Sequence, residues 1–247
     1  MPVSVRFYGL AAIALGLPGL ILGRFGAIGL ALPAAMASRP LAMLLAAWLI
    51  LGGLALNAGR TARIAALALA AFFALRVLVL EVPRAFAAPA TWVSWEVVAE
   101  PLVMALGGPL AFLLVRERRA DRAALPVRAV PPVFGACLVV FGISEFVYAA
   151  FTASLVPAWL PPSPLFWTYA TGACQIAAGL ALLSGIKARL AAISLTAMYL
   201  IFGLVVHLPR VIADPAAIGA WAENGVNLVL AGAAWTLADW LGRSGRR

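Results

Sequence analysis

Six residues in the second half of the chain have polar or ionisable side chains that could do chemistry within an otherwise apolar sequence. Glu145 lies about fifteen residues into an apolar run, where a charge is costly unless it faces a helix-bundle interior or a wet cavity. His207 is the single histidine. A carboxyl group and an imidazole can donate or accept protons, and an arginine can polarise a carbonyl oxygen. The candidate polar site consists of Glu145, Tyr148, His207, Arg210, Glu223 and Asn227.

The first half carries a related set of residues, displaced by 126 positions. The stretch EVPRAFAAPATWVSW (81–95) reappears as HLPRVIADPAAIGAW (207–221), with six of fifteen positions identical. At this offset Glu81 takes the place of His207, while Glu145 is matched by a glycine. The first-half counterpart of the candidate site consists of Arg76, Glu81, Arg84, Glu96 and Glu100.

Structural roles are an alternative for several of these residues. Arg84 and Arg210 could bind lipid phosphate or cap the C-terminus of a helix. Glu145 could be a structural carboxylate whose side chain reaches towards the membrane surface, and His207 could be a polar residue at the interface. The residue types alone leave both interpretations open.

The composition indicates an integral membrane protein. The chain is 65% hydrophobic and 11% charged, with a mean hydropathy of +1.04, whereas soluble domains are about half apolar and about a quarter charged. Apolar runs of about 20 residues, the length that an α-helix needs to cross a bilayer, recur along the whole chain. We therefore expect an all-α polytopic transmembrane protein, with the lipid bilayer as its first partner.

Eight spans are expected from the apolar runs between charged residues and prolines. They lie at about 7–31, 40–58, 62–82, 97–115, 131–151, 164–184, 188–208 and 218–239. The 126-residue offset relates the first four spans to the last four. The expected organisation is an N-terminal four-helix repeat (1–115), a basic linker (116–130) and a C-terminal four-helix repeat with a tail (131–247). Because each repeat has an even number of spans, the repeats are expected to be parallel.

The cations are unevenly divided between the two ends of these spans. Thirteen of the eighteen Lys and Arg residues fall on one side, many of them in the segment 116–128, and four fall on the other. The positive-inside tendency places both termini in the cytoplasm. The Ala-, Gly- and Arg-rich composition is typical of a bacterial protein, so the expected location is the bacterial cytoplasmic (inner) membrane. A nucleic acid partner is not expected, because the net charge of +9 comes without a nucleic-acid-binding motif, although binding of the linker to nucleic acid or acidic lipid is an alternative.

The sequence contains no set of residues that could ligate a haem or a metal ion. A single histidine excludes a bis-histidine haem and a histidine-rich metal cluster. Cys137 and Cys174 both lie in apolar runs, and we expect them to be buried, inert thiols. No haem or metal site is therefore expected.

Three stretches of the second half resemble the DoxX-like integral membrane proteins. They are GISEFVYAAFTASLVPAWLP (142–161), GACQIAAGLALLSG (172–185) and HLPRV (207–211). The resemblance covers residues 131–240, and the first repeat looks like a diverged copy. It implies a four-helix bundle and, as in a few members, association with quinone-linked oxidoreductases or thiol-stress complexes. Similar proteins often carry a histidine where this chain has Glu145.

Three functions fit these residues. The first, implied by the resemblance, is a quinone-associated redox membrane subunit in which Glu145 and His207 exchange protons and Arg210 polarises a carbonyl. Quinone is then the expected cofactor, and a membrane or redox protein is the expected partner. The second is a non-catalytic binder or transporter of a small apolar or anionic molecule, in which Arg76 and Arg84 pair with anionic groups. The third is a structural partner of a membrane enzyme. No catalytic residue is identified, so enzymatic activity is left open.

Overall fold

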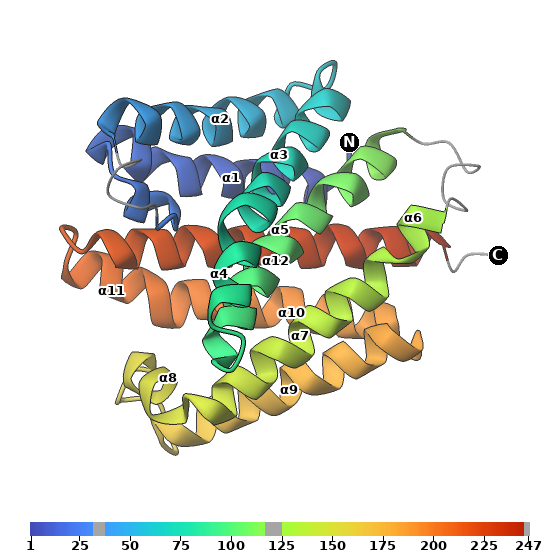
Figure 1. Cartoon of the computed structure of the whole chain (residues 1–247). Helices are drawn as coiled ribbons and strands as arrows, with labels where there is room; N and C mark the ends of the chain where they lie inside the picture. The colour runs from blue at the N-terminus through green and yellow to red at the C-terminus, as the bar shows by residue number, and fades with distance from the viewer. Residues whose placement is uncertain (32–37, 117–124, 245–247) are drawn as a thin grey trace.

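The computed structural model describes residues 1–31, 38–116 and 125–244, and all regular structure among them is helical (Figure 1). This confirms the predicted all-α fold. Residues 32–37, 117–124 and 245–247, which include much of the predicted basic linker and the end of the tail, lie outside the described residues. The helices are α1 (Val3–Leu22), η1 (Phe25–Ile28), α2 (Arg39–Asn57), α3 (Ala62–Arg76), η3 (Val77–Glu81), α4 (Val82–Ala87), α5 (Trp92–Arg116), α6 (Leu125–Arg128), α7 (Val130–Val147), α8 (Ala149–Leu155), α9 (Pro164–Ser184), α10 (Ala188–Phe202), η5 (Gly203–His207), α11 (Leu208–Ala213) and α12 (Ile218–Ser244).

Seven helices among the described residues are long and apolar enough to cross a membrane, so the chain is a multi-pass membrane protein. They are α1, α2, α3 to α4, α5, α7, α9 and α10 to α11. The first predicted span, 7–31, was wrong at both ends. The helix begins at Val3 and ends at Leu22, because Gly23 adopts a left-handed conformation (φ 61°) that terminates it. The fifth predicted span, 131–151, was also too long, since α7 ends at Val147 and the separate helix α8 follows.

The predicted eighth span coincides with α12, the longest of the described helices at 27 residues. This helix runs through the middle of the bundle, between α1 and α2 on one side and α10 and α11 on the other (Figure 1). Fifteen of its residues are buried. A helix enclosed by other helices needs no continuous apolar surface towards lipid, which explains why α12 is less apolar than the seven spans.

Glycine lets two pairs of neighbouring helices approach backbone to backbone. In the α7–α9 pair, a Cβ atom added to Gly135 would lie 2.6 Å from the carbonyl oxygen of Gly179, and one added to Gly179 would lie 2.6 Å from that of Gly135. In the α1–α2 pair, a Cβ atom on Gly9 would lie 3.0 Å from the carbonyl oxygen of Gly53. These distances leave no room for a side chain, as at the small-residue contacts of transmembrane helices. The glycines therefore set the spacing of both pairs.

The two halves of the chain interlock. The first helix of each half packs against the second helix of its own half and also against the last helix of the other half: α1 contacts α2 and α12, and α7 contacts α9 and α5. Tyr8 of α1, which is fully buried, donates a hydrogen bond from its hydroxyl to the carbonyl oxygen of Met104 in α5 (2.7 Å). Ser4 donates to Asp239 of α12 (2.5 Å). The sequence predicted one four-helix repeat in each half. The packing shows that helices of each half also contact helices of the other half.

A π-helical turn precedes the proline in two of the long helices. η3 joins α3 to α4, and η5 joins α10 to α11. The bounds of α10, η5 and α11 lie 126 residues after those of α3, η3 and α4, respectively. Pro83 and Pro209 occupy the first turns of α4 and α11. The predicted spans 62–82 and 188–208 were too short: the wider turn takes up the missing hydrogen bond, and the helix continues to Ala87 or Ala213. Glu81 and His207 are the last residues of these turns.

Candidate functional site

A polar cavity of about 200 Å³ lies where five elements meet, namely α5, α7, α9, the α10–η5 helix and α12. Its lining combines carboxyl groups, amides and one imidazole with aromatic and aliphatic side chains. The lining residues are Glu96, Glu100, Phe141, Glu145, Gln175, Tyr199, Phe202, His207, Glu223, Val226, Asn227 and Leu230. Glu96 and Glu100 come from the first half and the other residues from the second. The structure therefore gathers candidate residues of both halves around one cavity.

Four polar atoms in this lining are buried without a hydrogen-bond partner among the described residues. They are Glu145 Oε2, Gln175 Oε1, Tyr199 OH and His207 Nδ1. Gln175 and Tyr199 are each only 3% exposed. Buried polar groups in native proteins are nearly always paired, since an unpaired one costs about 1–3 kcal/mol. These four atoms are the groups that a bound polar molecule would satisfy.

His207 stands beside the ion pair between Arg210 and Glu223, at a distance where a protonated imidazole would join it. Arg210 Nη1 pairs with Glu223 Oε2, and His207 Nδ1 lies 3.7 Å from the same oxygen, which is too far for a hydrogen bond. Glu223 thus joins α12 to α11 through Arg210 and leaves the imidazole facing the cavity. Arg210 itself does not line the cavity.

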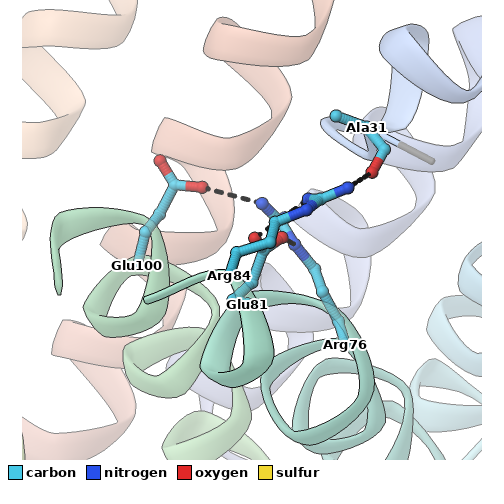
Figure 2. A network of polar contacts seen from close by, with 5 residues as sticks. All are labelled: Ala31, Arg76, Glu81, Arg84 and Glu100. Carbon is cyan, nitrogen blue, oxygen red and sulfur yellow. Dashed lines mark hydrogen bonds and ion pairs between the residues drawn. The ribbon is translucent and has the colours of Figure 1, made fainter. Parts of the chain in front are cut away.

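The corresponding residues of the first half form a closed ionic network (Figure 2). Arg76 Nε donates to Glu81 Oε1 (3.1 Å), and Arg84 Nη1 donates to Glu81 Oε2 (3.2 Å). Arg76 Nη2 reaches Glu100 Oε1 (3.5 Å), and Arg84 Nη2 donates to the carbonyl oxygen of Ala31. Arg76 is 8% exposed and Glu81 is 3% exposed. Two arginines and two carboxylates balance in charge, and Glu100 connects the network to the cavity.

The exchange of Glu81 for His207 between the halves explains this difference. In the first half the residue that ends the π-helical turn, Glu81, is the carboxylate partner of Arg84 three residues later. In the second half that position is His207, and Arg210 finds its carboxylate on α12 instead. In the first half, Glu81 is therefore held in ion pairs with arginines. In the second half, His207 faces the polar cavity.

An apolar cleft of about 650 Å³ adjoins the polar cavity. It lies between α8, α9, α10 and η5, with walls that include Leu155, Trp167, Met198, Ile201 and Val205. Ile201 is 56% exposed, so the cleft reaches the outer surface of the bundle. Three residues line both spaces, namely Glu145, Phe202 and His207. The border between an apolar and a polar compartment therefore carries a carboxyl group and an imidazole.

Two sequence expectations need correction at this site. Cys137 is buried, but Cys174 is exposed and lines the apolar cleft, so it is not the buried thiol that the apolar run suggested. Tyr148 lines neither space; its hydroxyl accepts a hydrogen bond from the backbone N–H of Val93 (3.1 Å) and joins the end of α7 to the start of α5.

Two polar lining residues, Gln175 and Tyr199, were not among the sequence candidates. Gln175 had a usable signal, because an amide within a long apolar run is itself costly in a membrane. Tyr199 had none, since tyrosine is common on both lipid-facing and buried surfaces. Asn227, which was a candidate, donates from Nδ2 to the carbonyl oxygen of Tyr199 (2.6 Å) and holds α12 against α10. Within the described residues, no group of three or more His, Cys, Asp and Glu side chains is placed to hold a metal ion.

A family described as "Domain of unknown function (DUF8561)" matches residues 134–238, which is less than half of the chain. The matched segment runs from α7 into α12 and includes Glu145, Gln175, Tyr199 and His207. The family carries no assigned activity and does not connect the chain to the DoxX-like proteins. Comparison with curated proteins and with solved structures found no match.

Proposed function

We propose that this chain is a DoxX-like membrane protein that binds a quinone, with the apolar chain of the quinone in the cleft and its ring in the polar cavity. The observation that carries the proposal is the shared border, where Glu145 and His207 line both compartments. Ligand sites are concave, largely apolar and equipped with a few convergent polar groups, and this pair of spaces has that form. The cleft reaches the surface at Ile201, which suits a ligand that arrives dissolved in lipid.

The residues of the cavity fit the ring of a quinone. Tyr199 OH and His207 Nδ1 have no hydrogen-bond partner among the described residues, and each can donate a hydrogen bond to a carbonyl oxygen of the quinone. A bound quinone supplies a ring that accepts two electrons and two protons. Glu145 and His207 hold and move the protons at the border, and a membrane or redox protein partner supplies the electrons. Arg210 serves to hold Glu223 rather than to polarise a carbonyl.

The alternative function is a non-catalytic binder or transporter of a small molecule. An anionic ligand gains no support, because four carboxyl groups line the cavity. Arg76 and Arg84, which would have bound the anion, are both paired with Glu81. A neutral apolar molecule fits the cleft but would leave the polar atoms of the cavity unpaired.

The proposal includes eight spans, with α12 as the eighth. Contacts between α1 and α12 run in antiparallel order along both helices: Ser4 bonds Asp239, Tyr8 lies against Gly232, and Leu15 lies against Gly225. A helix that accompanies a spanning helix over this length crosses the same thickness of membrane. Both termini then lie on one side, which the cation distribution makes the cytoplasm of a bacterial cell.

Two parallel four-helix repeats are part of the same proposal. The matching bounds of the two π-containing helices, 126 residues apart, support it. One hydrogen bond also recurs at the same offset. The indole N–H of Trp95 donates to the carbonyl oxygen of Pro89, and the indole N–H of Trp221 donates to the carbonyl oxygen of Pro215, each at 3.0 Å.

The quinone proposal is tested by blocking the cleft. Ala197 is exposed and lines the cleft, whereas Ala71, which stands 126 residues earlier, is exposed on α3 and lines neither space. Ala197→Trp is expected to weaken binding of a decyl-chain quinone analogue about tenfold or more, measured by equilibrium dialysis on protein in lipid nanodiscs. Ala71→Trp is the matched control and is expected to leave the dissociation constant unchanged. Equal binding by both variants and the native protein would refute the proposal.

A further inference from the structure

We infer that the polar cavity also takes a second class of ligand, a long-chain primary amine whose ammonium group sits between Glu96 and Glu145. The inference rests on the site of the proposed function, but not on the ligand being a quinone. Four carboxyl groups line the polar cavity, and two of them are already paired, Glu100 with Arg76 and Glu223 with Arg210.

Glu96 and Glu145 have no arginine or lysine partner in the part of the chain that the structure describes. They face one cavity from α5 and α7, and each lies within the apolar bundle. Unpaired carboxylates there are costly, and a cation in the cavity removes that cost. His207 also stands at this border; its Nδ1 lies 3.7 Å from Glu223 Oε2 and has no hydrogen-bond partner among the described residues.

The unpaired atoms have the pattern that an ammonium group requires. Glu145 Oε2, Gln175 Oε1 and Tyr199 OH are oxygen atoms that can accept hydrogen bonds, and none has a partner among the described residues. A primary ammonium group offers three N–H donors. A quinone carries only acceptors, so it leaves the amide oxygen of Gln175 unsatisfied. The geometry thus favours a donor-rich, positively charged head group.

The remaining walls suit the rest of such a ligand. Phe141, Tyr199 and Phe202 line the cavity, and aromatic faces attract cations within about 6 Å. Beyond Phe202 the apolar cleft, at about 650 Å³, has room for an alkyl chain. The ligand class is therefore an amphiphilic cation that reaches the site from the lipid.

Binding to the full chain in lipid nanodiscs tests this inference, with empty nanodiscs as the baseline. Decylamine is expected to bind at least about tenfold more tightly than decanol, which has the same chain and no charge, because charged hydrogen bonds are worth roughly ten- to hundredfold in affinity. Glu145→Gln and Glu96→Gln should each reduce decylamine binding about tenfold or more. Asp214→Asn removes an exposed carboxylate that lines neither space, and it should change nothing.

The outcomes separate this inference from the proposed function. Equal binding of decanol and decylamine overturns the inference, as does decylamine binding that survives both glutamine substitutions in folded protein. If the quinone analogue binds in an Ala197-dependent manner and decylamine does not, the proposed function stands and the inference fails. If decylamine binds in that manner and the quinone analogue does not, the inference stands and the quinone assignment fails.

Discussion

Replacing Glu81 with glutamine is expected to destabilise the protein far more than making the same change at Glu223. Glu81 Oε1 and Oε2 accept from Arg76 and Arg84 at 3.1 and 3.2 Å, and the side chain of Glu81 is 4% exposed. Its neutralisation leaves the buried guanidinium of Arg76 with only the longer contact to Glu100 (3.5 Å). Removing one partner of a buried ion pair costs about 3–5 kcal/mol.

The second half provides the matched comparison. The side chains of Arg210 and Glu223 are 36% and 40% exposed, and exposed pairs contribute about 0–1 kcal/mol. For a chain of this length, 1 kcal/mol shifts the melting temperature by about 2–4 °C, so Glu81→Gln should lower it by roughly 6–20 °C and Glu223→Gln by no more than about 4 °C.

Thermal unfolding of both variants in the same detergent, followed by circular dichroism, measures this difference. The double variant Arg76→Gln/Glu81→Gln should recover part of the loss, because it no longer buries an uncompensated positive charge. Equal destabilisation by the two single variants would refute the distinction between a buried network and a partly exposed pair. So would a double variant that is less stable than Glu81→Gln.

Three further predictions follow from the packing. Gly179→Ala should destabilise the protein by about 1–3 kcal/mol, measured by unfolding in detergent. The control Gly219→Ala should be nearly neutral, because its added Cβ atom meets nothing within 4 Å. Equal effects of the two changes would contradict the backbone contact between α7 and α9. An apolar maleimide should label Cys174 and spare Cys137, as detected by mass spectrometry. A decyl-chain ligand in the cleft should slow the labelling of Cys174. Labelling of Cys137 at the same rate as Cys174 would count against the cleft. In a chain without native cysteines, Asp214→Cys should react with an impermeant maleimide added outside bacterial cells, and a cysteine added at the C-terminus should not; the reverse pattern would overturn the orientation.

The two halves use the position shared by Glu81 and His207 differently. Glu81 is paired with both Arg76 and Arg84 and does not line the polar cavity. His207, at the same position in the second half, lines both compartments, and its Nδ1 has no hydrogen-bond partner among the described residues. We therefore propose that the first copy of the stretch has a structural role and that the second copy contributes to a binding site.

Much of the secondary structure follows from the sequence alone. Apolar runs bounded by charge or proline predicted the starts of α3, α9, α10 and α12 to the residue, because an apolar run of about 20 residues satisfies its backbone hydrogen bonds within a helix. The 126-residue offset likewise predicted that equivalent elements would recur. What it missed were local features: the stop at Gly23, and the π-helical turns that carry two helices past proline.

The convergence of polar residues was decided only by the tertiary structure. Glu96 and Glu145 are 49 positions apart in different halves, and no local pattern brings them to one cavity. Their meeting depends on α5 packing against α7 across the two halves, and on the rotation of each helix about its own axis. That rotation is set by close contacts over the entire helix, such as those at Gly135 and Gly179, which is why a linear sequence shows the polar residues but not the space they share.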